Sequence, residues 1–300
     1  MDEVDWHKLR GKLEQEHVVL RGRLCGAVEQ DGPILVELAV AVAGAGRVEE
    51  AGALLRAAGS IGHVVRDSDR EPLVAEAERI ADHAAAVVHV ERLLAACPGF
   101  SVGHQARLRL RLGRGLGGLE RNAESLEVLQ ELCSGPLAAA LGEQARDARK
   151  QVAYALIQFE RHAEALTYLD ARSRDAHEQN LIGVCCCALG RFSEALAAYR
   201  RSRKLQGGWI VPWDNAGWVH QRRGEFDKAI EVHRAVIAAD DSYAWGHYHL
   251  ALALAARGEL EEAAVELERA VELGYSVASI REDPYAVALR GTAAYWRVVG

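Results

Sequence analysis

Apolar and small residues recur every 34 positions through the C-terminal half of the chain. This interval separates four sets of matching residues: Gly183, Gly217 and Ala251; Gly190, Gly224 and Gly258; Phe192, Phe226 and Leu260; and Ala195, Ala229 and Ala263. A constant period of this length indicates stacked helix–turn–helix units. One unit cannot bury its apolar face alone, so neighbouring units stack and leave a long concave surface free. The pattern predicts helix pairs over 178–205, 212–238 and 246–273.

These matching residues resemble the tetratricopeptide repeat (TPR) family. In that family the first small residue lets the paired helices approach, the glycine lets the backbone reverse, and the alanine keeps the second helix close. The aromatic position of the family holds Trp213 in one unit but Gln179 and His247 in the other two. The closing proline of the family is replaced in all three units. The resemblance implies an all-α, right-handed α-solenoid.

Weaker copies of the pattern occur upstream, which gives about seven TPR-like units in all. In the copy over 104–133, a few residues must be inserted at a glycine-rich turn, Gly113–Gly118. The segment Asp283–Gly291 matches the DP-x-x-x-x-LRG motif that closes many bacterial repeat arrays. We therefore expect four segments: an N-terminal capping helix over 1–31, divergent repeats over 32–145, well-matched repeats over 146–277 and a C-terminal capping segment over 278–300.

Composition narrows the function classes. The net charge is -7, whereas a nucleic-acid-binding protein normally has a basic excess, so we expect no nucleic-acid partner. No apolar run is long enough to cross a bilayer, and the charged start lacks an apolar signal core. The six cysteines are scattered or adjacent rather than framed for disulfides. These features predict a cytoplasmic protein without a membrane partner.

The segment 107–120 contains a G-x-G-x-x-G motif at Gly113, Gly115 and Gly118, the order that a dinucleotide site requires. No alternation of strands and helices follows it, so an enlarged turn between helices is the favoured interpretation. If the segment is helical, three arginines share one stripe: Arg107, Arg111 and Arg114. This stripe is a candidate anion site. A solvated basic face is the alternative that we prefer.

Cysteine and histidine residues suggest chemistry but form no recognisable site. The side chains of Cys185, Cys186 and Cys187 fan outward on a helix, so they do not converge on a metal ion. Packing is the favoured role for these thiols, and a redox role is the alternative. If one of them reacts, we expect it to be Cys187, which should point into the groove. His220, His233 and His247 occupy positions where the family places packing aromatics. No catalytic motif occurs. We therefore expect no metal, no cofactor and no enzymatic activity.

The resemblance also implies where a partner would bind, because the first helix of each unit lines the concave groove. Carried over by register, the groove residues are Tyr154, Asn180, Cys187, Asp214, Trp218, Gln221, Arg222, Trp245, Tyr248 and Leu252. Trp218, Trp245 and Tyr248 form a candidate binding wall, since aromatic side chains are rigid anchors that recur in binding hot spots. In the alternative arrangement, Tyr285 or Trp296 of the closing segment folds over them.

The sequence thus favours an adaptor or scaffold that binds a peptide or helical segment of another protein in this groove. A carboxylate clamp of the kind found in some TPR domains is disfavoured, because Asp214 would repel an anion. Two alternatives stay open: a ligand-responsive regulator that changes the curvature of the solenoid, and a chaperone-like binder of an exported client. The N-terminal helix could also pair two copies of the chain.

Overall fold

The computed structural model describes residues 32–44, 47–60, 66–97 and 99–300, and the regular elements within these ranges are all helical. The expected N-terminal capping helix over 1–31 lies outside the described residues. Contacts divide the chain into two units, Met1–Phe159 and Glu160–Gly300.

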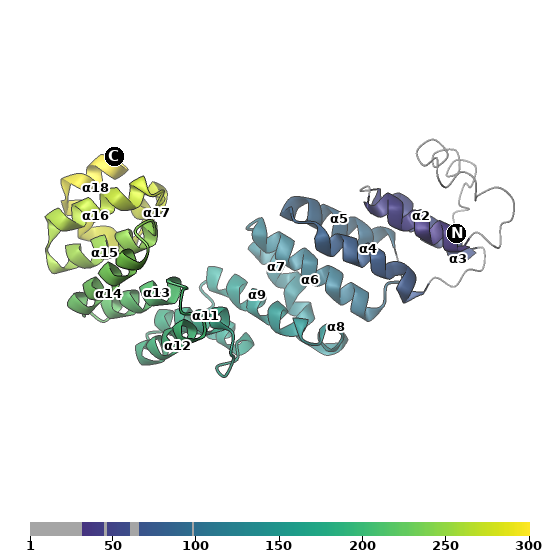
Figure 1. Ribbon diagram of the computed structural model, residues 1–300, viewed down its shortest axis with the longest axis horizontal. Coiled ribbons are helices and arrows are strands. Elements are labelled where there is room, and N and C mark those ends of the chain that lie inside the picture. Colours follow the sequence, from purple (N-terminus) through teal and green to yellow (C-terminus); the bar gives the residue numbers. More distant parts are fainter. Residues whose placement is uncertain (1–31, 45–46, 61–65, 98) are drawn as a thin grey trace. The chain divides into compact units, whose positions relative to one another are not determined.

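The first unit is built from helices that pack against their neighbours in the chain (Figure 1). Leucines that are almost completely buried, among them Leu54, Leu73, Leu93 and Leu108, fill the space between them. The elements are α2 (Gly32–Gly44), α3 (Val48–Ser60), α4 (Asp67–Arg79), α5 (His83–Ala96), α6 (Val102–Gly118), α7 (Asn122–Gln130), η1 (Glu131–Cys133), α8 (Gly135–Leu141) and α9 (Gln144–Gln158).

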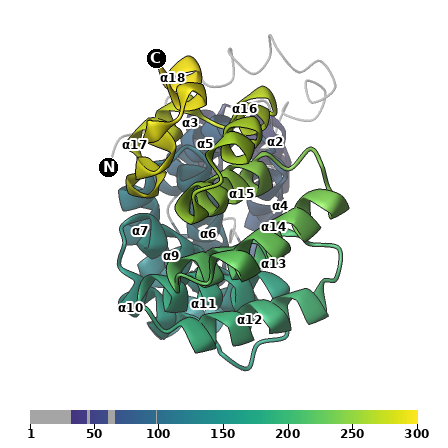
Figure 2. The same ribbon diagram turned by 90° about the vertical axis from the view of Figure 1, so that its left-hand side faces the viewer.

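In the second unit, the three predicted helix pairs follow one another as α11–α12, α13–α14 and α15–α16 (Figure 2). The closing elements α17, η3, η4 and α18 come last, and α18 packs on α16. The elements are α10 (His162–Ala165), η2 (Leu166–Tyr168), α11 (Ala176–Ala188), α12 (Phe192–Leu205), α13 (Val211–Arg222), α14 (Phe226–Ala239), α15 (Ala244–Arg257), α16 (Leu260–Glu272), α17 (Val277–Glu282), η3 (Pro284–Val287), η4 (Leu289–Gly291) and α18 (Ala293–Val299).

Close approach of the paired helices explains two of the repeated small residues. A Cβ atom at Gly183 would lie 2.3 Å from the ring of the buried Tyr199, and one at Gly217 would lie 2.5 Å from the ring of His233. Carbon atoms in contact normally stay about 3.5–4.0 Å apart. Any side chain at these two positions would therefore push the helices of the pair apart.

The glycine-rich segment in the first unit is not the turn that the sequence suggested. Gly113, Gly115 and Gly118 lie inside α6, and the chain reverses after them, with Glu120 in the left-handed region at φ 60°. The inserted residues therefore lengthen a helix. No strand precedes α6 among the described residues, so the dinucleotide-site interpretation has no structural support. A Cβ atom at Gly113 would lie 2.4 Å from Leu129 of α7, which shows that this glycine serves helix packing.

Candidate functional site

Several of the predicted groove residues surround one cavity in the second unit, with a volume of about 650 Å³. It is lined by Val184, Cys187, Ala188, Tyr199, Val211, Asp214, Asn215, Trp218, Arg222, Tyr243, Trp245, Tyr248, His249, Tyr275, Asp283 and Tyr285. Four of the predicted residues do not line it. Tyr154 lies on α9 of the first unit, Asn180 accepts a hydrogen bond from Asn215, Gln221 is half-buried on α13, and Leu252 is buried in the core.

Aromatic rings form much of the cavity wall. Trp218 stacks on His249, with 5.4 Å between the ring centroids, and Trp245 meets Tyr275 edge-on at 4.8 Å. Half of the Trp245 surface is exposed (51%), whereas Tyr248 is only 1% exposed and stacks on Tyr275. Tyr248 is therefore too buried to serve as a contact surface of the predicted binding wall. The ring lies in the core, and its hydroxyl donates a 2.8 Å hydrogen bond to Asp283.

The closing segment covers part of this wall, which agrees with the alternative arrangement. Tyr285, from η3, meets Trp218 edge-on with 4.8 Å between ring centroids, and Asp283 binds the Tyr248 hydroxyl. Trp296 does not take part, since it packs on Tyr295 and is 61% exposed. The closing segment thus covers Trp218 and leaves Trp245 open.

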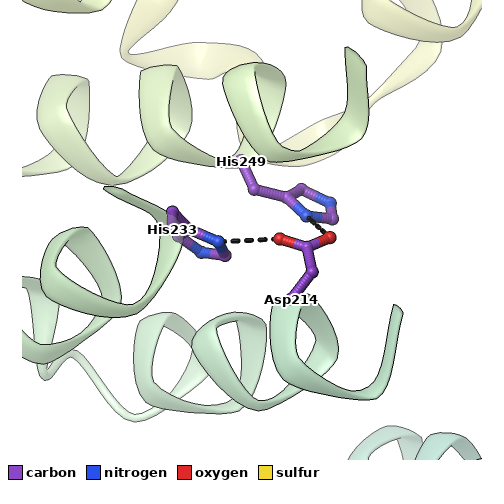
Figure 3. Close-up of side chains that lie close together, drawn as sticks. All are labelled: Asp214, His233 and His249. Carbon is purple, nitrogen blue, oxygen red and sulfur yellow. Dashed lines mark hydrogen bonds and ion pairs between the residues drawn. The ribbon is translucent and has the colours of Figure 1, made fainter. Parts of the chain in front are cut away.

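Asp214, His233 and His249 form a polar cluster that the sequence did not reveal (Figure 3). Asp214 of α13 is 1% exposed, and each of its carboxylate oxygens accepts a hydrogen bond of 2.8 Å, one from Nδ1 of His233 and one from Nδ1 of His249. Burial raises the pKa of the Asp214 carboxyl, but the two histidines outweigh it and hold that pKa well below its usual range. Asp214 therefore stays ionised.

The repeat period could have indicated that residues of this cluster lie close together. Positions 214 and 248 are equivalent in consecutive units, so Asp214 lies beside the turn of α15 that includes His249. His233 meets Asp214 because it packs over Gly217 of the same helix pair. Taken one at a time, the histidines resemble packing residues and Asp214 resembles a groove position, so the cluster emerges only when neighbouring units are considered together.

Comparison with known proteins supports the architecture. Neither a protein-family model nor a curated protein matches the chain. Among solved structures, a TPR protein of Thermus thermophilus is 23% identical, with a TM-score of 0.51, and the match covers 62% of this chain and 99% of that one. A tetratricopeptide repeat protein of Parabacteroides merdae is 14% identical, with a TM-score of 0.53, and the match covers 87% of this chain and 98% of that one. The chain has the tetratricopeptide repeat fold.

The arginine stripe in the first unit does not form a free basic face. Arg107 donates hydrogen bonds to Glu71 and Glu78, and Arg114 donates a bond of 3.0 Å to Asp147. The guanidinium of the buried Arg111 binds a backbone carbonyl at the end of α4. These contacts tie α4 and α9 to α6. Two of the three predicted anion-binding groups thus already have carboxylate partners.

Cys187 is a poor nucleophile in the second unit. Its side chain is 4% exposed although it lines the cavity, and burial raises the pKa of its thiol. Cys185 and Cys186 are also buried, and burial raises the pKa of each of their thiols. The expectation that Cys187 is the reactive thiol is therefore wrong, because a buried thiol rarely forms the thiolate.

Charged groups at the cavity edge are few. Arg222 lies over two aromatic rings, with its guanidinium carbon 5.6 Å from the centroid of Tyr285 and 5.9 Å from that of Phe192. Two further histidines form local pairs away from the cavity, His220 with Glu225 at 2.7 Å and His247 with Glu266 at 2.6 Å.

Over the part of the chain that the structure describes, none of the helices has both the length and the hydropathy of a bilayer span.

Proposed function

We propose that this chain is a non-enzymatic adaptor that binds a peptide or helical segment of another protein in the aromatic cavity of the second unit. The observation that supports this function most directly is the half-exposed Trp245 at the mouth of a largely apolar cavity. An exposed tryptophan beside a cavity is a typical binding anchor, because its rigid ring loses little conformational entropy when it is covered.

The polar groups of the cavity suggest how a partner would be oriented. Arg222 is held over Tyr285 and Phe192, so its guanidinium is fixed in place at the edge. It can donate hydrogen bonds to a carbonyl or carboxylate of the bound segment. Apolar side chains of the partner would then enter between the rings, while Arg222 fixes the register of the segment.

The alternatives are less well supported. A regulator that binds an anion at the arginine stripe would have to displace Glu71, Glu78 and Asp147 from their ion pairs. A chaperone-like binder would use the same cavity and differs from the adaptor only in its client. Cytoplasmic location and the absence of nucleic-acid and membrane partners remain predictions from composition.

Trp245→Ala and Trp296→Ala form a matched pair for testing this function. Both tryptophans lie in the second unit and are more than half exposed, at 51% and 61%, but only Trp245 lines the cavity. Partners are captured from native lysate with each variant and with wild-type protein, and the recovered segment is synthesised. Its dissociation constant is then measured by calorimetry.

We expect Trp245→Ala to weaken binding by about 2 kcal/mol, or roughly 30-fold in the dissociation constant, since central tryptophans are frequent hot spots. Trp296→Ala should bind as wild type does. Equal affinity of wild-type protein and Trp245→Ala would show that the partner binds elsewhere.

A further inference from the structure

Three metal-ligating side chains from three different helices converge in the second unit. Asp214 comes from α13, His233 from α14 and His249 from α15 (Figure 3). One ligand atom of each residue lies within 4.8 Å of the others. Two imidazoles and one carboxylate form a donor set that suits divalent first-row transition ions.

The carboxylate at the centre of this cluster is buried. Asp214 is 1% exposed, and among the described ion pairs its only partners are the two histidines. Buried charges in proteins are usually paired with an opposite charge or coordinated to a metal ion. Coordination to a divalent cation is one way in which the buried Asp214 carboxylate could be satisfied.

We propose that Asp214, His233 and His249 bind a divalent transition-metal ion such as Zn²⁺, through one carboxylate oxygen and the two Nδ1 atoms. Ligand atoms about 2.0–2.1 Å from a tetrahedral ion lie about 3.3 Å from one another. The two present nitrogen–oxygen contacts of 2.8 Å go to different oxygens of Asp214, and the ligand atoms lie within 4.8 Å of one another, so side-chain rotations must bring the three atoms to this common spacing. Asp214 and His249 line the cavity, which gives the ion an entry path and leaves room for a further ligand.

Protons must move within the rings when the ion binds. A carboxylate only accepts hydrogen bonds, so in the metal-free cluster Nδ1 of each histidine carries the proton. A metal ion needs the Nδ1 lone pair, so the proton leaves Nδ1, and Nε2 of the same ring carries a proton in the metal-bound state. Nε2 of His233 is buried without a hydrogen-bond partner. Since such outer partners typically change metal affinity about 10–100-fold, we expect weaker binding than at a fully supported site.

Titration of the full-length, metal-free protein with Co²⁺ tests this proposal, because Co²⁺ of low coordination number absorbs visible light. We expect one equivalent to bind with ligand-field bands, and Zn²⁺ to abolish these bands by competition. His249→Ala and Asp214→Asn should each weaken Co²⁺ binding at least about 10-fold, the loss expected from even an outer-shell change. His220→Gln is the matched control. His220 lies on α13 but pairs with Glu225 outside the cluster, so this variant should bind as wild type does.

Two results would overturn the proposal. One is the absence of saturable Co²⁺ binding by wild-type protein, which would leave the cluster as a hydrogen-bonded part of the core. The other is equal binding by wild type and His249→Ala. Circular dichroism checks the fold of each variant. If Asp214→Asn does not fold, His249→Ala decides, because the His249 side chain is partly exposed (12%). This test does not depend on the proposed peptide binding, since it needs no partner protein.

Discussion

The glycine-rich helix α6 offers a direct test of why its glycines are there. The proposed perturbation is Gly113→Ala, with Gly103→Ala on the same helix as its control. At Gly113 the new methyl group would lie 2.4 Å from Cγ of Leu129, which is 1% exposed and cannot swing into solvent. At Gly103 the nearest atom lies 3.8 Å away, which is an ordinary contact distance.

The expected magnitudes follow from these distances. Replacing a helical glycine by alanine increases the free energy of unfolding by about 0.5–1 kcal/mol when there is space for the methyl group. Overpacking a well-packed core costs about 1–3 kcal/mol. The overlap at Gly113 is severe, so we take the upper value of the overpacking cost. After the gain from replacing glycine is subtracted, we expect Gly113→Ala to lower the free energy of unfolding by about 2 kcal/mol. Gly103→Ala should raise the free energy of unfolding by up to about 1 kcal/mol. The free energies of unfolding of the two variants should therefore differ by about 3 kcal/mol.

Urea denaturation followed by far-ultraviolet circular dichroism measures both free energies of unfolding, by linear extrapolation. Hydrogen exchange on peptides from α6 and α7 locates the change. Faster exchange should appear in Gly113→Ala and be absent from Gly103→Ala. If Gly113→Ala is as stable as Gly103→Ala, the two helices do not approach as closely as described, and the packing explanation of these glycines fails.

Two further predictions concern acid stability and thiol chemistry. Hydrogen bonding from Arg107 is the largest influence on the Glu71 carboxyl and lowers its pKa in the folded state. The resulting stabilisation is present above the unfolded-state pKa, about 4.3, and is lost as the pH falls through the folded-state value. The urea midpoint of Glu71→Gln should therefore fall less steeply below pH 5 than that of wild type, and parallel profiles would contradict this. Cys187 should react with iodoacetamide slowly in native protein and rapidly in urea at pH 7, because burial raises the pKa of its thiol. Rapid native labelling, located by mass spectrometry, would contradict its burial.

The candidate site was only partly predictable. Trp218, Trp245 and Arg222 follow from the repeat register alone and do line one cavity. Tyr248 is buried in the core, where its hydroxyl bonds to Asp283 of the closing segment, 35 residues away. A register assigns a side chain to a face of a helix, but whether that face is covered depends on segments outside the repeat.

The sequence by itself determined the helix pairs, because a period of 34 residues fixes where small residues and turns must stand. Gly190, Gly224 and Gly258 all adopt the positive φ that the pattern required. Only the tertiary structure decided which polar groups meet. Asp214 and His233 are 19 residues apart, and Asp214 and His249 are 35 apart, yet each pair is in hydrogen-bond contact. Spacing along one helix predicts contacts within that helix, whereas contacts between helices depend on their packing distance and rotation.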